Sequence, residues 1–397
     1  MLFLLLWLWA ASAFANEITV KTGIYDHYRY QSANGPYDTH GFALGADLGA
    51  LFTPAPSLAL GVRYLLADSA GTKSNDNHYN PDLAGKDGRL AGIIEAYGQY
   101  EAHDLLVRLG RQSINTPFAN PDLYTFKPRT FAGIWTTYDG LPVHLAFARM
   151  FKRASRFDDV FDRGNRYIDS DTQGLLATGA HYGPWDYWYY RFYDLADLHY
   201  GTMTWFYENW TFAIQGLYES ESGQALLGPV QATLGGAKVS RLIHAHRLSL
   251  VWNILTAHDH TFRRGGIVHP YNDLSGTLYT DTINFGLENT GPAKALGLVW
   301  QSPERPWVFS LRGIYYWVRH GFDGEIYDTS GSYGFPNRPV KDNQNVWAID
   351  SGLLWRPQRY PRFSVDYTVG VRDFEKSQYG PFVESRLHLI YSWQKGF

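Results

Sequence analysis

The sequence predicts an all-β protein: a transmembrane antiparallel β-barrel of about eighteen strands, with long external loops and short periplasmic turns. In residues 381–397, PFVESRLHLIYSWQKGF, the apolar residues Leu387, Leu389, Tyr391 and Trp393 alternate with polar ones. Such alternation is typical of a strand with one apolar and one polar face. Aromatic residues form 17% of the chain, with 29 Tyr and 14 Trp, and barrels concentrate them at both membrane interfaces.

The same alternation recurs along the chain, and the connections between the alternating segments are sorted by length. Connections after even-numbered segments are short and carry turn residues, whereas many after odd-numbered segments are long and polar. A soluble sandwich has no reason to sort its connections in this way, so the pattern favours a barrel. The predicted segments are 18–29, 41–52, 57–67, 89–100, 104–112, 130–138, 142–151, 174–182, 185–193, 198–207, 210–219, 226–234, 247–257, 294–301, 307–318, 345–355, 362–372 and 382–394.

The start of the chain predicts export. An apolar run, LFLLLWLWAAS, precedes Ala13-Phe14-Ala15, so we expect a signal peptide over 1–15 and a barrel over 16–397. The chain has no cysteine, so disulfides are not its framework. The mean hydropathy of −0.31 and the lack of a second long apolar run disfavour a helical membrane protein. The net charge of −3 argues against a general nucleic-acid binder.

Residues 107–135, VRLGRQSINTPFANPDLYTFKPRTFAGIW, carry a family resemblance. A strand ends in Gly110-Arg111-Gln112, Asn115-Thr116-Pro117 follows, and Phe131-Ala132-Gly133 opens the next strand after Pro128. This order resembles the OprD family of outer-membrane substrate-specific porins. Residues 265–273, GGIVHPYND, give a looser match, and elsewhere only the strand pattern agrees.

The resemblance implies a monomeric, eighteen-stranded channel in the outer membrane of a Gram-negative bacterium. It also implies that the third and seventh external loops, 113–129 and 258–291, fold inward and form a constriction. A basic ladder on the lumen wall would guide small carboxylate-bearing solutes. The last strand, which ends in Phe397, resembles the closing strands that the barrel-assembly machinery reads, so we expect that machinery as a partner.

The residues themselves suggest which side chains face the lumen. Lipid-facing positions should be apolar, so the opposite parity points inward; on this rule Lys21 and Arg191 face the lumen. Arginine suits carboxylate recognition because its planar fork binds bidentately and stays charged. Acids of the same parity, among them Asp47 and Glu384, offer the alternative that these arginines brace the wall. The candidate substrate-guiding stripe, in which Arg111 is included beside Arg108, is Arg29, Arg63, Arg108, Arg111, Arg312, Arg372 and Arg386.

Polar and aromatic residues of the two loops form the candidate constriction. A mixed lining of this kind orients a zwitterion, although such residues often only solvate a loop or fix its turns. The candidates are Asn115, Thr116, Pro117, Tyr124, Arg129, Arg263, Tyr271 and Asp273.

These observations favour a passive channel for small carboxylate-bearing solutes, without cofactor or metal. A sugar channel, for which Tyr25, Tyr97, Tyr187 and Tyr189 would begin an aromatic track, and an anionic-polysaccharide exporter remain alternatives. A barrel hydrolase or adhesin is a more remote one. The chain contains no G-x-S-x-G, H-E-x-x-H or Walker motif, and the H-D-H triplet at 258–260 fits a solvated loop better than a catalytic site. We therefore do not expect an enzyme.

Overall fold

The computed structural model describes residues 16–31, 38–73, 79–81, 83–121, 125–154, 161–165, 167–168, 170–271, 276–283, 285–304, 306–319, 343–375 and 380–396. The predicted signal peptide over 1–15 lies outside these residues, as do Tyr124, Asp273 and Phe397. Within the described part of the chain, no helix combines the length and the apolar character needed to cross a membrane.

Strands form nearly all of the regular structure. The two short helices, η1 (Phe262–Arg264) and α2 (Leu287–Thr290), both lie in the connection between β14 and β15. The strands are β1 (Glu17–Gln31), β2 (Asp38–Ala55), β3 (Leu58–Asp68), β4 (Arg89–Ala102), β5 (Leu105–Gln112), β6 (Thr130–Tyr138), β7 (His144–Ala154), β8 (Phe161–Asp162), β9 (Leu175–Tyr182), β10 (Trp185–Phe192), β11 (Ala196–Tyr207), β12 (Trp210–Glu221), β13 (Gln231–Ile243), β14 (His246–Leu255), β15 (Ala293–Gln301), β16 (Trp307–Val318), β17 (Gln344–Trp355), β18 (Phe363–Phe374) and β19 (Phe382–Gly396).

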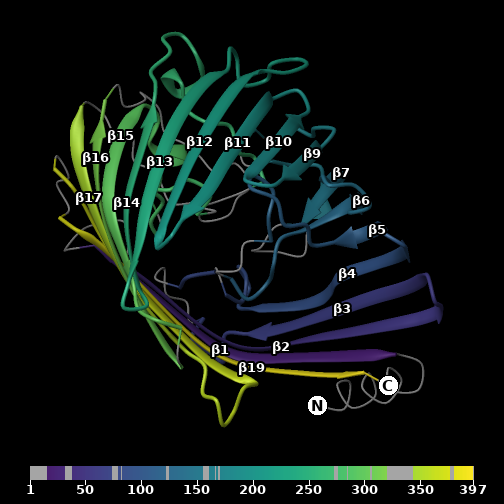
Figure 1. Cartoon of the computed structure of the whole chain (residues 1–397). Coiled ribbons are helices and arrows are strands. Elements are labelled where there is room, and N and C mark those ends of the chain that lie inside the picture. Colours follow the sequence, from purple (N-terminus) through teal and green to yellow (C-terminus); the bar gives the residue numbers. More distant parts are fainter. Residues whose placement is uncertain are drawn as a thin grey trace.

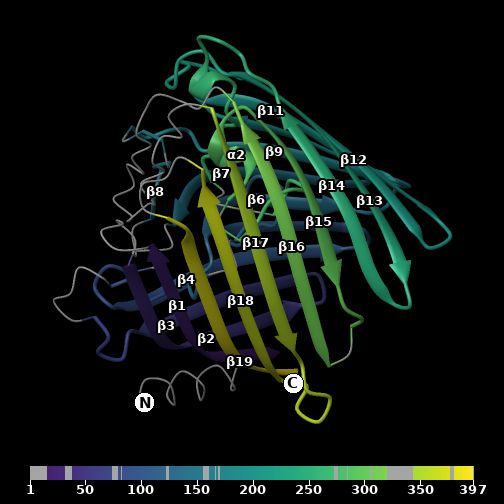
Figure 2. The same cartoon turned by 90° about the vertical axis from the view of Figure 1, so that its left-hand side faces the viewer.

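The strands close into a single antiparallel barrel. Of the nineteen strands among the described residues, β8 has only two residues; the other eighteen follow one another around the wall. Figure 1 shows the first strand, β1, beside the last, β19, and their register is continuous from Glu17↔Gly396 to Gln31↔Phe382. Figure 2 shows β15 to β19 side by side along the wall. This closure confirms the fold class predicted from the sequence.

The two faces of the wall have opposite character. On β14, Leu248, Leu250 and Trp252 are exposed, whereas the alternating positions Ser249 and Asn253 are buried. A strand places successive side chains on opposite faces, so the outer face of β14 is apolar, whereas its inner face is buried and carries the polar Ser249 and Asn253 together with Val251. An apolar outer band is what a barrel presents to hydrocarbon.

The connections follow the predicted alternation. On one rim, two-residue turns join β4 to β5, β9 to β10, β11 to β12 and β13 to β14. His244 and Ala245 both have positive φ, 48° and 68°, as a two-residue hairpin turn matched to the strand twist requires. The long connections 113–129 and 256–292 lie on the other rim.

One predicted strand is displaced. The sequence placed it at 226–234, whereas β13 spans Gln231–Ile243. Gly235 and Gly236 follow the predicted end directly but lie inside β13. A Cβ on Gly236 would lie 2.1 Å from Oδ1 of Asn253, so this glycine permits a close approach from the neighbouring strand rather than a break.

The predicted orientation of residues 185–193 is wrong. Tyr190 and Phe192 are fully buried and contact interior loops, so Tyr187, Tyr189 and Arg191 lie on the opposite face of β10. Both faces of this strand, WDYWYYRF, are aromatic, so alternation carries no information about which face is inner.

The closing pair offers a test of the fold. Leu389 on β19 pairs with Ile24 on β1 and with Val365 on β18. Replacing Leu389 with proline removes a ladder hydrogen bond from an interior strand, so the unboiled protein should lose its altered mobility in an SDS gel. Leu389→Ile should retain it, together with a β-type circular dichroism spectrum. A Leu389→Pro protein that still migrates as wild type, unboiled and boiled, would argue against closure at this seam.

Candidate functional site

The segment 113–129, called loop 3 below, crosses the barrel interior. The ring centroid of its Phe126 lies 4.5 Å from that of Tyr25 on β1. Its Phe118 packs edge-on against Tyr190 of β10 at 5.8 Å and Tyr200 of β11 at 5.3 Å. Loop 3 therefore touches two walls that lie far apart around the barrel.

The segment 258–291, called loop 7 below, is held on the wall formed by β12 to β18. The backbone N–H of Val268 donates to the Glu219 carboxyl on β12 at 2.8 Å. The N–H of Ile283 donates to Oδ2 of Asp350 on β17 at 2.8 Å. Arg312 on β16 donates to a backbone carbonyl of the same loop. Loop 7 therefore lies along the inner wall.

The two loops meet inside the barrel. Thr277 Oγ1 donates to the carbonyl of Pro117 at 2.7 Å, and Ala119 forms a parallel bridge with Tyr271. The Tyr271 hydroxyl also lies 3.2 Å from Thr172 Oγ1, in the connection after β8. Loops 3 and 7 thus form one connected layer across the interior.

The other candidate loop residues stabilise this layer locally. Thr116 closes a tight turn, with its N–H donating to the Ala119 carbonyl at 3.0 Å. Arg129 is buried where loop 3 ends, whereas Asn115 is exposed. The Arg263 guanidinium lies 4.8 Å from the ring centroid of Phe262 in η1.

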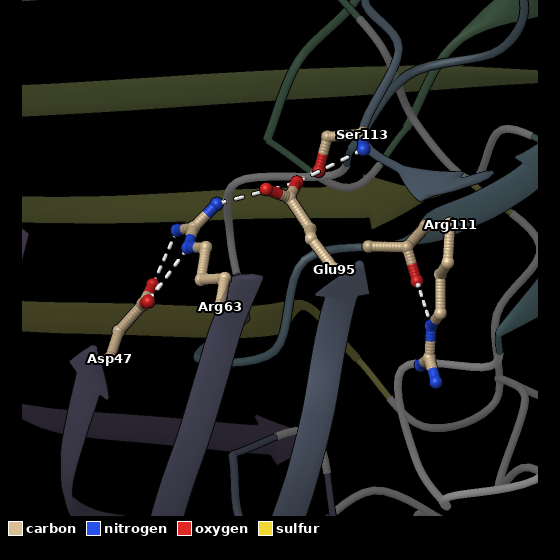
Figure 3. A network of polar contacts seen from close by, with 6 residues as sticks. Asp47, Arg63, Glu95, Arg111 and Ser113 are labelled. Atoms are coloured by element: carbon tan, nitrogen blue, oxygen red, sulfur yellow. Dashed lines mark hydrogen bonds and ion pairs between the residues drawn. The ribbon is translucent and has the colours of Figure 1, made fainter. Parts of the chain in front are cut away.

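Arg63 of the candidate stripe belongs to an ion-pair network (Figure 3). It binds Asp47 on β2 through two hydrogen bonds, one of them 2.6 Å between Nε and Oδ1. Its Nη1 lies 3.6 Å from Oε1 of Glu95 on β4, which accepts a 3.0 Å hydrogen bond from the Ser113 N–H of loop 3. Two acids thus compensate Arg63, and one of them, Glu95, also binds the start of loop 3.

Two further arginines share one acid at the barrel seam. The Nε atoms of Arg29 on β1 and Arg386 on β19 lie 3.3 Å and 2.7 Å from the carboxylate of Glu384, which is fully buried. Beside them, Nε2 of His27 and Nε2 of His388 are 2.7 Å apart. Two guanidinium groups thus share the Glu384 carboxylate.

Arg108 on β5 has a neutral partner. Its Nε and Nη2 donate to Oε1 of Gln99 at 3.1 and 2.7 Å, and its Cζ lies 4.4 Å from the ring centroid of Tyr97. No ion pair joins it to a carboxylate within the described ranges. The charge of Arg108 is therefore held in place but not neutralised.

The other stripe residues lie elsewhere. Arg111 pairs with Ala96 in the register of β4 and β5, which places it on the opposite face from Arg108. It donates to Thr130 at 3.1 Å, apart from the network (Figure 3). Arg372 on β18 lies 4.3 Å from the Phe382 ring. The structure therefore brings Arg29 together with Arg386, but it does not join all seven arginines.

A cavity of about 600 Å³ lies against the seam wall, between β1–β4 and the chain at β18–β19. Lys21, Arg63 and Arg362 line it together with the acids Asp47 and Glu95. Opposite charges therefore alternate along this part of the interior, below the arginines of the seam cluster.

The H-D-H triplet has no catalytic surroundings. His258 Nε2 lies 3.2 Å from Thr233 Oγ1, and Asp259 and His260 are exposed. Over the part of the chain that the structure describes, no three His, Cys, Asp or Glu side chains are grouped as metal ligands.

Known proteins were compared with the chain. No protein-family model matches it, and no curated protein sequence matches it. Solved structures do match. The outer membrane protein OpdK from Pseudomonas aeruginosa has a TM-score of 0.77 at 13% identity, covering 96% of this chain and 99% of its own. A BenF-like porin from Pseudomonas fluorescens Pf-5 has a TM-score of 0.77 at 13% identity, covering 96% and 98%. OccK2 (OpdF) from Pseudomonas aeruginosa, in complex with glucuronate, has a TM-score of 0.74 at 15% identity, covering 95% and 98%.

The chain has the fold of these porins. The resemblance to OprD-type porins predicted from residues 107–135 is thus confirmed at the level of the fold, and the neighbours' descriptions agree with the predicted outer-membrane location. Sequence reasoning missed the residues that seat the loops, notably Phe118, Phe126 and Glu219. Large aromatic residues inside an otherwise polar loop were a usable signal for the first two.

The seat of loop 3 can be tested at Phe126. A Cβ on Gly45 of β2 would lie 2.2 Å from the Phe126 ring, so the ring fills its site. Phe126→Ala removes this packing, which costs about 3–5 kcal/mol for a buried aromatic, and should free the loop and raise single-channel conductance. Phe147→Ala, at an exposed position of β7, should leave conductance unchanged. Equal conductance in both variants would show that Phe126 does not set the loop's position.

Proposed function

We propose that this protein is an outer-membrane channel of a Gram-negative bacterium for passive, substrate-selective uptake of small carboxylate-bearing solutes. One chain forms one pore, and transport needs no cofactor because the solute moves down its own gradient. Loops 3 and 7 form the constriction, and arginines of the inner wall attract the solute toward it.

The architecture supports a channel. The outer face is apolar, whereas the inner face carries charged groups that hydrocarbon does not solvate. Loops 3 and 7 meet inside the barrel through Thr277 and Pro117, so a solute that crosses passes this layer. OpdK, of the same fold, is described as an outer membrane protein and its BenF-like counterpart as a porin.

The neutral partners of Arg108 are the observation that favours a carboxylate as the solute. Its guanidinium is oriented by Gln99 and Tyr97, both neutral, so its charge stays available to an anion. Arg29 and Arg386 place two further guanidinium groups on the inner wall, beside Glu384. Charges on a low-dielectric wall focus their field and raise the local anion concentration, and guanidinium groups bind carboxylate with directed hydrogen bonds.

Two neighbours agree with this choice. One structure of OpdK is with vanillate, and OccK2 is in complex with glucuronate; both names denote carboxylates. A sugar channel has less support, because Tyr25 is buried beneath Phe126 and Tyr187 and Tyr189 lie on the outer face of β10.

Removing two arginine charges from the inner wall tests the proposal. Arg108→Gln with Arg386→Gln should lower uptake of a carboxylate solute by about tenfold, the lower end of electrostatic steering effects, and shift ion selectivity toward cations. Uptake of a neutral solute of similar size should stay the same. At about 1 M salt the Debye length falls to about 3 Å, so the difference should shrink.

The matched control removes a compensated pair. Arg63→Gln with Asp47→Asn leaves the net charge unchanged and keeps Glu95, which holds loop 3 at Ser113, so this variant should preserve the selectivity. Reversal potentials in proteoliposomes or planar bilayers measure both variants. A double mutant of Arg108 and Arg386 that assembles normally and keeps the wild-type reversal potential and uptake would refute carboxylate guidance.

A further inference from the structure

Loop 7 contains a buried pair of acids. Asp281 and Glu288 are 1% and 4% exposed. Both carboxyl groups flank Gly286, where an added Cβ would lie 2.5 Å from Asp281 Oδ1 and 2.4 Å from Glu288 Oε2. The two carboxyl groups therefore meet at one glycine, close enough to repel each other if both are ionised. Two contacting carboxylates in a buried site do not both ionise without a large penalty.

We propose that a proton shared by Asp281 and Glu288 holds residues 278–283 and 285–288 of loop 7 on the wall, and that its loss at higher pH releases them and makes the channel switch between conductance levels. This regulation rests on the channel function proposed above. It concerns the same constriction but not the choice of solute.

The charged groups around the pair act on Asp281 in both directions: Arg312 favours its charged carboxylate, but less than burial and Glu288 disfavour it. Arg312 on β16 donates to the backbone carbonyl of Asp281, and no ion pair joins it to the Asp281 carboxylate within the described residues. Asp350 on β17 adds negative charge and binds the N–H of Ile283. The further titratable or charged groups facing this segment are Tyr200 on β11, Tyr316 on β16, Arg372 on β18, Glu384 and Arg386 on β19, and His269 and Tyr279 within loop 7.

The same segment is the part of loop 7 seated on β16 to β18. The Leu278 N–H donates to Oδ2 of Asp281 at 2.9 Å, and Phe285 packs edge-on against Tyr316 with ring centroids 4.8 Å apart. Ile283 fills the space above Gly370, where an added Cβ would lie 2.2 Å from its Cγ2. Repulsion between the two carboxylates therefore acts directly on the residues that fix the loop to the wall.

The sign of the pH effect follows from the titration of the pair. Burial, and then the neighbouring Glu288 carboxyl, raise the pKa of Asp281 well above its usual range. The seated loop is therefore fully stabilised below the ordinary aspartate pKa of about 3.9. That stabilisation is lost as pH rises through the raised pKa. Across this window the ratio of released to seated loop should grow by up to about tenfold per pH unit, the slope for one proton.

The experiment is single-channel recording from about pH 5 to about pH 9, a range that spans raised carboxyl pKa values. In the wild type, the ratio of time in the reduced conductance levels to time in the main level should rise with pH. In Asp281→Asn and in Glu288→Gln, an amide donates the hydrogen bond without titrating, so this ratio should stay low and flat. Asp259→Asn neutralises an exposed acid of the same loop and should keep the wild-type profile.

Two results would overturn the proposal: a wild-type ratio that does not change with pH, or an Asp281→Asn profile that follows the wild type. Heat-modifiable migration in SDS gels shows whether each variant is assembled. If Asp281→Asn does not assemble, Glu288→Gln takes its place in the comparison. The wild-type profile decides the matter if neither assembles. Reversal potentials recorded in the same bilayers keep the two hypotheses apart. If the wild-type channel does not prefer carboxylates but its conductance levels depend on pH as expected, only the proposed solute is wrong. If it prefers carboxylates but its conductance levels do not depend on pH, only the role of the acid pair is wrong.

Discussion

The hydrogen bonding between β1 and β19 is the constraint on which the rest of the structure depends. In hydrocarbon no water satisfies a free backbone group, so a spanning sheet must have no edge. The continuous register between these two strands removes the last edge. Once the sheet is closed, each strand has one face toward lipid and one toward the lumen. The apolar outer residues and the polar, loop-filled interior follow from that division.

Closure also leaves a wide interior that has to be filled. A barrel of eighteen long strands is too wide for its own inward side chains to fill, so loops 3 and 7 occupy the space. They are seated by aromatic packing at Phe118 and Phe126 and by carboxyl groups that accept backbone N–H bonds, as at Glu219 and Asp350. Charges that brace the wall are compensated, as at Arg63, whereas Arg108 is held by neutral groups and keeps its field.

Loop 7 combines the seating of a loop by acids with the compensation of charge. Acids are suitable anchors for a loop inside a barrel because they accept hydrogen bonds from the loop's backbone without occupying much space. The same acids become a liability where two of them meet, as at Asp281 and Glu288. A proton is then part of the packing. Under the two proposals, selectivity and gating rest on different groups: arginines of the inner wall, Arg108 among them, and the acid pair of loop 7.

The sequence by itself determined the fold class, the number of strands and the alternation of short and long connections. These depend on local patterns: a period of two along each strand, and turn residues between strands. It misplaced β13 and reversed β10, because a glycine pair inside a strand resembles a break and two aromatic faces look alike. It selected the arginines but did not separate Arg63 from Arg108, since the difference lies in partners on other strands, Asp47 and Glu95 against Gln99. The pairing of Asp281 with Glu288 and the seats of loops 3 and 7 were decided only by the tertiary structure, because burial and contact between chemically ordinary residues arise when the barrel closes around them.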